Sequence, residues 1–165
     1  MDKIRRALVP GSFDPPTIGH YDLALRAAEI FDEVYVTAFS NGEKRGRFDD
    51  QTRLRMLETA FDGIPNIICG VSHGLLADFC REKGIRFIVK GSRSAVDFDY
   101  ELSLAMINRA LDPELETVIL PTKQEYMFVS STMVSELIKY GKDPSQYLPR
   151  GVAEIIAERD RLTGY

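Results

Sequence analysis

Cysteine is scarce in this sequence, and long apolar runs are absent. The two cysteines, Cys69 and Cys80, each lie in an apolar stretch and are expected to be small buried side chains, not a disulfide framework. The longest apolar run, residues 67–71, covers five residues, whereas a membrane-spanning helix needs about 20. The amino-terminal residues become polar again within a few positions, unlike a secretory signal. These absences predict a cytoplasmic protein with no membrane partner.

An excess of basic residues is also missing. Lys and Arg total 21 and Asp and Glu total 25, so the net charge is −4. A general nucleic-acid-binding surface needs positive charge, so we expect no nucleic-acid partner. A small anionic ligand held by a few cations is still compatible with this balance. The 165 residues, 44% hydrophobic and 28% charged, contain no repeat or linker and predict one soluble globular domain over 1–165.

Strand-like and helix-like segments alternate along the chain. β-Branched and aromatic runs predict strands, and apolar residues at three- and four-residue spacing predict helices. The expected strands are 4–9, 34–39, 66–70, 86–90 and 116–120, and the expected helices are 19–31, 49 or 50 to 62, 75–83, 97–111, 130–140 and 152–161. Parallel strands need such helical crossovers. The prediction is a Rossmann-like α/β fold, a doubly wound five-stranded parallel sheet with helices on both faces.

The turn after the first expected strand, residues 10–20, contains several groups that suit phosphate. It lacks the GxGxxG spacing of dinucleotide-binding folds, and no GxxxxGK[ST] loop occurs in the chain. Gly11 allows close backbone approach, Ser12 offers a hydroxyl, and His20 lies at a helix start, where free N–H groups favour anions. Taken alone, a Gly-x-His turn is more simply explained by turn formation and capping. Ligands of doubly wound sheets bind at the carboxyl ends of the strands, which favours a site here.

A basic cluster follows the fourth expected strand. If the strand order is 3-2-1-4-5, Lys90 and Arg93 face the turn that carries His20. Arginine suits bidentate phosphate contacts, whereas lysine acts as a point charge. Lys44, on the polar loop 40–48, either closes over the same crevice or remains a solvated loop lysine.

One face of the expected helix 97–111 is polar. Asp97, Glu101 and Asn108 share this face, with the small Ala105 between them. The stripe is either a wall of the pocket or a face toward solvent.

Four motifs carry a family resemblance. The first turn resembles the nucleotidyltransferase superfamily signature G-[ST]-F-D-x-x-[TH]-x-G-H. The chain further resembles the phosphopantetheine adenylyltransferase family, whose motifs are T-x-G-H, R-G-x-R, D-F-x-Y-E and I-S-S-S. Here they stand as Thr17–His20, Lys90–Arg93, Asp97–Glu101 and Val129–Thr132.

Other families and classes fit less well. Nicotinate mononucleotide adenylyltransferases, the main alternative, favour H-x-G-H and are longer. Cytidylyltransferases carry an R-T-x-G-I-S-T-T string that is missing here. A nucleotide-binding regulator without catalysis is a further alternative, from a different functional class.

The resemblance implies transfer of the adenylyl group of ATP to 4′-phosphopantetheine by direct in-line attack. It also implies Mg²⁺ carried mainly by ATP, no metal site on the protein, a homo-hexamer and feedback by coenzyme A. The implied catalytic residues are His20, Ser12, Lys44 and Lys90. The residues implied to bind phosphopantetheine are Ser12, Lys44, Leu76 and Lys90. The residues implied to bind ATP are Ser12, Phe13, His20, Gly91, Ser92, Arg93, Glu101, Tyr126, Met127, Phe128, Val129, Ser130, Ser131 and Thr132.

Three positions depart from the family pattern. Lys90 replaces the usual arginine, which keeps the charge but loses the fork-shaped donor set. Ser12 and Thr132 exchange serine and threonine and keep the hydroxyl. The acceptor phosphate is therefore the group whose contacts are expected to differ.

Overall fold

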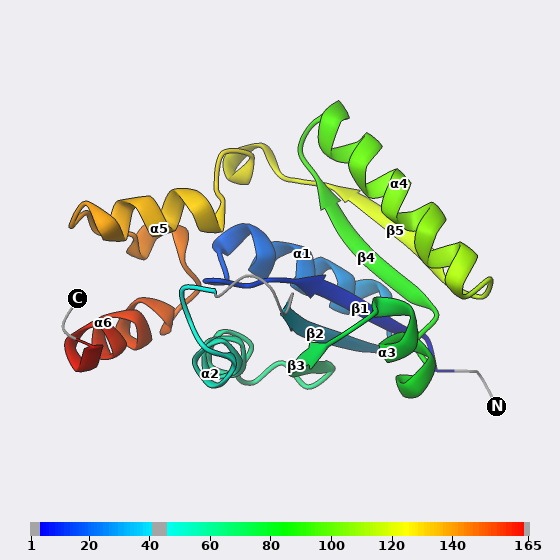
Figure 1. Cartoon of the computed structure of the whole chain (residues 1–165), viewed down its shortest axis with the longest axis horizontal. Helices are drawn as coiled ribbons and strands as arrows, with labels where there is room; N and C mark the ends of the chain where they lie inside the picture. The colour runs from blue at the N-terminus through cyan, green and yellow to red at the C-terminus, as the bar shows by residue number, and fades with distance from the viewer. Residues whose placement is uncertain (1–3, 41–45, 164–165) are drawn as a thin grey trace.

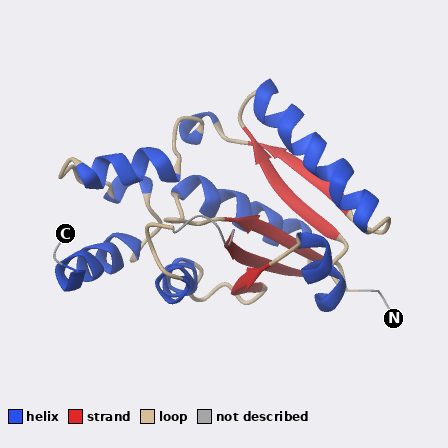
Figure 2. Ribbon diagram, viewed as in Figure 1, coloured by secondary structure: helices blue, strands red, loops and turns tan. Residues whose placement is uncertain are grey.

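Five parallel strands form one central sheet with helices on both faces (Figure 1, Figure 2). The computed structural model describes residues 4–40 and 46–163. The strands are β1 (Arg6–Gly11), β2 (Glu33–Ser40), β3 (Ile67–His73), β4 (Phe87–Ser92) and β5 (Glu116–Pro121). The helices are α1 (Ile18–Ile30), α2 (Asp50–Ala60), α3 (Leu76–Lys83), α4 (Ala95–Leu111), α5 (Ser131–Lys139) and α6 (Val152–Thr163), with short 3₁₀ turns η1 (Gln124–Tyr126) and η2 (Ser145–Tyr147).

The strand order is β3-β2-β1-β4-β5, which confirms the predicted doubly wound α/β sheet. The order reverses between β1 and β4, and ligands bind at such a point in this class of fold. β1 pairs with β2 through six residues, from Arg6 to Gly11, but with β4 only at Ala7 and Leu8. Beyond Leu8 the two strands separate, and Figure 1 shows β4 and β5 diverging from β1 toward their carboxyl ends.

Alternate residues of β1 supply the two cores. Ala7 and Val9 point to the face covered by α1, α2, α5 and α6, whereas Leu8 points to the face covered by α3. All three side chains are at most 1% exposed. Burial on both sides explains why this strand is a short continuous apolar run.

All the predicted strands and helices are present, with shifted ends. β1 continues two residues past the expected end at Val9, because Pro10 and Gly11 still align with β2. Proline is tolerated there, since β1 has no partner on its β4 side at that point. The expected stop at Gly84 is confirmed: its φ of 66° ends α3 in the left-handed region.

The two cysteines are not joined by a disulfide. Burial, with a smaller contribution from a nearby carboxylate, raises the pKa of each thiol to about 12. Cys80 is buried, as predicted, whereas Cys69 is only partly buried, and both thiols stay protonated at neutral pH. Among the described residues, no helix is long and apolar enough to cross a membrane.

Candidate active site

The separation of β1 from β4 opens a cavity of about 380 Å³ at the carboxyl ends of the strands. Its walls come from the β1 exit, the start of α1, the β4 exit, the start of α4 and the segment leading into α5. Among the residues expected to bind substrates, those lining it are His20, Lys90, Gly91, Arg93, Glu101, Tyr126, Val129, Ser130 and Ser131. The predicted meeting of His20 with Lys90 and Arg93 is thus confirmed.

His20 is fixed by the cap of its own helix. Thr17 is the N-cap of α1, and its backbone N–H donates to Nδ1 of His20 at 3.0 Å. The His20 N–H in turn donates to the Thr17 hydroxyl at 3.4 Å, which completes a capping box. Since Nδ1 accepts, the neutral ring carries its proton on Nε2. The local sequence thereby leaves an N–H donor for the cavity.

The ring of His20 is neutral at physiological pH. It is half-buried and open toward the cavity. Its pKa is lowered to about 4, chiefly because burial disfavours the charged ring, and further because Lys90 and Arg93 are positive. His20 is therefore placed to donate a hydrogen bond, not to take up a proton.

Lys90 and Glu101 form an ion pair across the cavity wall. Lys90 Nζ lies 3.3 Å from Glu101 Oε1, and the side chains are 22% and 13% exposed. The second carboxylate oxygen, Oε2, is buried and has no hydrogen-bond partner. A buried acceptor without a partner costs free energy of folding, so this oxygen is a candidate to accept a hydrogen bond from a ligand. The polar face of α4 is therefore a pocket wall, which decides between the two interpretations of Asp97 and Glu101.

Arg93 holds the far wall together. Its Nε lies 3.3 Å from Asp97 Oδ2, while its Nη1 donates to the carbonyls of Met127 and Val129, each at 3.2 Å. One guanidinium thus joins the β4 exit, α4 and the segment before α5. Its planar set of donors makes such a bridge possible.

The start of α5 faces the same cavity. Ser130 is the N-cap, and its hydroxyl accepts from the Met133 N–H at 3.1 Å. The Ser131 hydroxyl donates to the Pro15 carbonyl at 2.7 Å and so fastens α5 to the first turn. Free N–H groups at a helix start favour anions.

The first turn, residues 10–20, is held in place by contacts outside the cavity. Asp14 accepts the backbone N–H groups of Arg47 and Phe48 at 2.8 and 2.9 Å. Arg53, in α2, donates to the Ser12 carbonyl at 2.9 Å. The sequence analysis missed Arg53, although the charge stands three and four residues before the buried Met56 and Leu57 and so shares their face.

Several cavity residues were also missed. Leu23 and Arg26 follow His20 at three-residue steps, which is the helical signal that would have identified them. Arg26 Nη1 donates to the Pro121 carbonyl at 2.9 Å. Asp22 pairs with Arg26 and with Lys123.

Other expected residues lie outside this cavity. Leu76 lines a small adjoining space of about 10 Å³ with Lys90, Glu101 and Asn108. Lys44 lies outside the described residues. The remaining expected residues that do not line the main cavity are Ser12, Phe13, Ser92, Met127, Phe128 and Thr132. The Phe13 ring is 1% exposed, and its centroid lies 5.1 Å from that of the His20 ring in an edge-on arrangement. Phe13 therefore packs against His20 from the protein interior.

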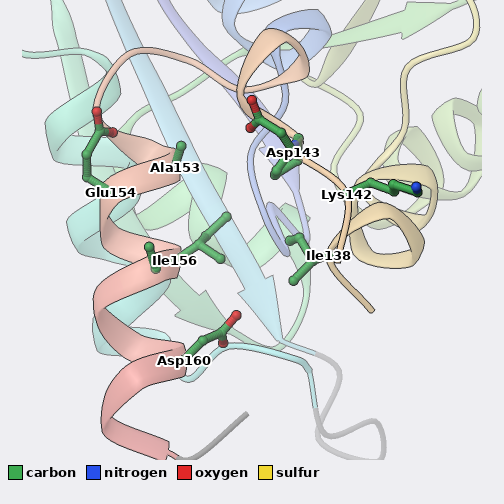
Figure 3. A pocket seen from close by; sticks show the side chains of 9 residues that line it. Ile138, Lys142, Asp143, Ala153, Glu154, Ile156 and Asp160 are labelled. Atoms are coloured by element: carbon green, nitrogen blue, oxygen red, sulfur yellow. The ribbon is translucent and has the colours of Figure 1, made fainter. Parts of the chain in front are cut away.

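A second cavity, of about 390 Å³, lies between α5 and α6. Figure 3 shows Ile138 and Ile156 facing each other across it, with Asp143 and Asp160 at opposite ends. Its lining residues all follow the last strand, β5, in the chain, and none of them is a histidine or an arginine. The β1–β4 cavity, where polar groups converge and a pKa is strongly shifted, is the candidate active site.

Metal ligation by the protein is not favoured by the cavity. The three carboxylates that line it, Asp22, Asp97 and Glu101, are each paired with a cation. Among the described residues, no group of three or more His, Cys, Asp or Glu side chains could hold a metal ion.

Comparison with known proteins identifies the family. A family model described as cytidylyltransferase-like matches residues 8–137. The phosphopantetheine adenylyltransferase of Frankia alni is 42% identical over 160 residues, which cover 94% of this chain and 98% of that protein. The Streptomyces coelicolor enzyme of the same name is 42% identical over 158 residues, covering 96% and 99%. The Staphylococcus carnosus enzyme is 38% identical over 154 residues, covering 93% and 96%.

This chain belongs to the phosphopantetheine adenylyltransferase family. It is a nucleotidyltransferase.

A structural comparison agrees on the fold. A solved structure from Vibrio parahaemolyticus, assigned as a nicotinate-nucleotide adenylyltransferase, matches with a TM-score of 0.70 and covers 94% of this chain and 93% of that one. The two sequences are 18% identical, so the likeness supports the Rossmann-like architecture alone. The full-length relatives favour the phosphopantetheine adenylyltransferase family over the nicotinate alternative.

Proposed function

We propose that this chain transfers the adenylyl group of ATP to 4′-phosphopantetheine, forming dephospho-coenzyme A and pyrophosphate. The observation that carries the proposal is the convergence of a histidine donor, a lysine and a helix start on one cavity. All three suit phosphate oxygens. Membership of the family supplies the identity of the two substrates.

The chemistry needs no general base on the protein. The phosphate monoester of phosphopantetheine is largely dianionic near neutral pH and attacks the α-phosphorus of ATP directly. A new phosphorus–oxygen bond forms in line with the bond to the leaving pyrophosphate, which breaks. The lowered pKa of His20 supports a role as donor: its Nε2–H would bind an α-phosphate oxygen as negative charge grows there.

The remaining residues would divide between the two substrates. Ser130–Thr132, at the start of α5, would bind the β- and γ-phosphates, and the unpaired Glu101 Oε2 would accept a hydrogen bond from the nucleoside. Phe13 would act through its backbone, since its ring is buried.

On the acceptor side, Lys90 would contact the phosphate by exchanging its partner Glu101 for phosphate oxygen. Ser12 and Lys44 would contact the same phosphate. Leu76, next to Lys90 across the small adjoining space, would contact the pantetheine arm.

Magnesium would enter with ATP. Mg²⁺ prefers oxygen ligands and commonly keeps substrate phosphates as its main ligands. The pairing of every cavity-lining carboxylate with a cation supports triphosphate oxygens as the holders of the ion.

The function is tested by mixing the purified chain with ATP, Mg²⁺ and either phosphopantetheine or nicotinate mononucleotide. We expect pyrophosphate release and dephospho-coenzyme A only with phosphopantetheine. Release with nicotinate mononucleotide would establish the alternative acceptor. ATP binding without pyrophosphate release from either acceptor would establish a regulator.

We further propose a homo-oligomer, a hexamer by resemblance, formed through α4. None of its residues is buried, and its polar stripe faces the cavity, so its apolar residues face outward. Val96, Ile107 and Leu111 recur at eleven- and four-residue spacing and are 46–79% exposed. An exposed apolar stripe of this kind fits a second copy of the chain. Coenzyme A feedback and a cytoplasmic location are expectations from the resemblance and composition.

A further inference from the structure

Arg53 is buried although nothing in the chemistry above uses it. Within residues 4–40 and 46–163 it is the one charged side chain that is buried, with 5% exposure. Its Nε is buried without a hydrogen-bond partner. A buried ion pair can often be replaced by apolar residues without loss of stability, so fold stability alone does not account for a guanidinium here.

The Arg53 guanidinium joins the exits of two strands. Nη1 donates to the Ser12 carbonyl at 2.9 Å, directly after β1. Nη2 donates to the Ser40 hydroxyl, at the end of β2, and to Asp50. The Ser40 hydroxyl also donates to Asp50 Oδ1 at 3.0 Å, which closes the group. Through Arg53, α2 therefore ties the ends of β1 and β2 together beside the site.

The carbonyl that Arg53 binds belongs to the peptide linking Ser12 to Phe13. Phe13 has a φ of 46°, in the left-handed region that non-glycine residues avoid. The orientation of this peptide fixes where the Phe13 ring lies, and that ring packs edge-on against His20 at 5.1 Å. A hydrogen bond at the Ser12 carbonyl thus acts on the position of His20 through two contacts.

We propose that Arg53 is a positioning residue for adenylyl transfer, which holds the Ser12–Phe13 peptide so that the first turn and His20 meet the α-phosphate in the reacting arrangement. Arg53 touches no substrate itself. The inference rests on the proposed function, because its measurable consequence is a loss of rate.

The test compares Arg53→Met with Arg53→Lys, using Arg55→Met as the matched control. Arg55 lies on the same helix and pairs with Glu158 at 2.8 Å, with its side chain 57% exposed. Methionine keeps the unbranched stem of the side chain but removes every donor, and lysine keeps the charge but loses the fork. Small displacements in a reacting arrangement cost about 100-fold in rate, so we expect kcat to fall about 100-fold in Arg53→Met and less in Arg53→Lys. The exposed pair is worth little, so Arg55→Met should stay within about twofold.

A structural role is separated from positioning by two further readouts. We expect Arg53→Met to melt cooperatively, to bind a non-hydrolysable ATP analogue with the affinity of the unmodified chain, and to lose rate in kcat. In Arg53→Ala, added N-ethylguanidinium should restore part of kcat, and it should leave an Arg55→Ala variant unchanged. Unchanged kcat in folded Arg53→Met, or a loss that only follows the unfolded fraction, would overturn the proposal.

The two proposals fail in different ways. An inactive unmodified chain would refute the proposed function, whereas an active one with an indifferent Arg53→Met variant would refute the positioning role alone.

Discussion

At the scale of single residues, the site depends on a histidine that stays uncharged. A neutral imidazole with its proton on Nε2 donates one hydrogen bond, and its other nitrogen accepts one. The Thr17 N–H holds Nδ1, and the positive side chains nearby disfavour a second proton. Burial, and to a lesser extent these positive charges, thus keep His20 neutral, so that it acts as a hydrogen-bond donor.

The first prediction concerns the protonation of His20. Nitrogen-15 NMR should show the Nε2–H tautomer and a pKa near 4, with the signal assigned by its loss in His20→Gln. A doubly protonated ring at pH 6 would contradict the capping geometry.

The same pKa has a consequence for stability. The pKa rises from about 4 in the folded chain to 6.5 in the unfolded chain, so between these values the unfolded chain binds more protons. The free energy of unfolding therefore falls as the pH drops from 6.5 to 4, by an amount on the order of 3 kcal/mol at full extent. Urea titrations across this range should show a weaker pH dependence in His20→Gln.

The second prediction concerns the rate. His20→Ala removes one transition-state donor, so kcat should fall by about 100-fold or more. Single-turnover measurements at saturating ATP separate this loss from weaker binding. Turnover equal to that of the unmodified chain would refute the role given to His20.

The residues that sequence reasoning found and missed differ in a physical way. His20, Lys90 and Arg93 stand at strand exits or at a helix start, so the strand order alone brings them together. Arg53 reaches the first turn because α2 packs against β2 and β3, and although helical spacing puts Arg53 on the buried face, it does not identify this long-range partner. The ion pair between Lys90 and Glu101 was missed as well, because the motifs assign the two residues to different substrates.

At the scale of elements, short capping sequences fix the starts of α1, α2, α4 and α5. Asp49 accepts from Thr52 at 2.7 Å and begins α2, and Ser94 accepts from Asp97 at 3.1 Å and begins α4. Such ends could be predicted closely because the cap and its partner are three residues apart. The predicted end of β1, at Val9, was wrong because pairing with β2 continues the strand through Pro10. That pairing is a property of the sheet and has no local signal.

The third prediction concerns Gly151, which precedes α6. Its φ is 83°, and a Cβ there would lie 2.5 Å from Thr59 Cγ2 on α2. Gly63 has a similar φ of 78° with nothing within 4 Å, so it is the matched control. A side chain in the left-handed region costs about 1–2 kcal/mol, which we expect for Gly63→Ala.

In Gly151→Ala the clash adds to this backbone strain, and the total loss should reach about 2–4 kcal/mol. Urea unfolding of both variants measures the difference. Equal losses would mean that α2 and α6 adjust without penalty.

At the scale of the whole molecule, α4 has its polar side inward and its apolar side outward. Asp97, Glu101 and Asn108 line the two adjoining cavities, while Val96 is 79% and Met106 67% exposed. A helix usually buries its apolar stripe. This reversal is the physical reason why a second copy of the chain is expected against α4, and a single sequence could not show it because helix orientation depends on the fold.

The fourth prediction tests this surface. Ile107→Asp puts a charge in the exposed stripe, so the assembly should dissociate toward the 18.6 kDa chain. Leu162→Asp, at a position on α6 that is 81% exposed, is the control and should leave the assembly intact. Light scattering after gel filtration measures the mass. An unmodified chain that already elutes as a monomer would refute the proposed assembly.

The brief pairing of β1 with β4, at Ala7 and Leu8 only, gives the sheet a seam where its hydrogen-bond ladder is thinnest. The bridges near the open end of this seam are side chains, such as Arg26 on the Pro121 carbonyl. A nucleotide bound there would contact the β1 side and the β4 side of the cavity at once and so hold them together. Substrate binding would therefore also stabilise the folded chain, because the substrate supplies contacts between two parts of the protein that few bonds of its own connect.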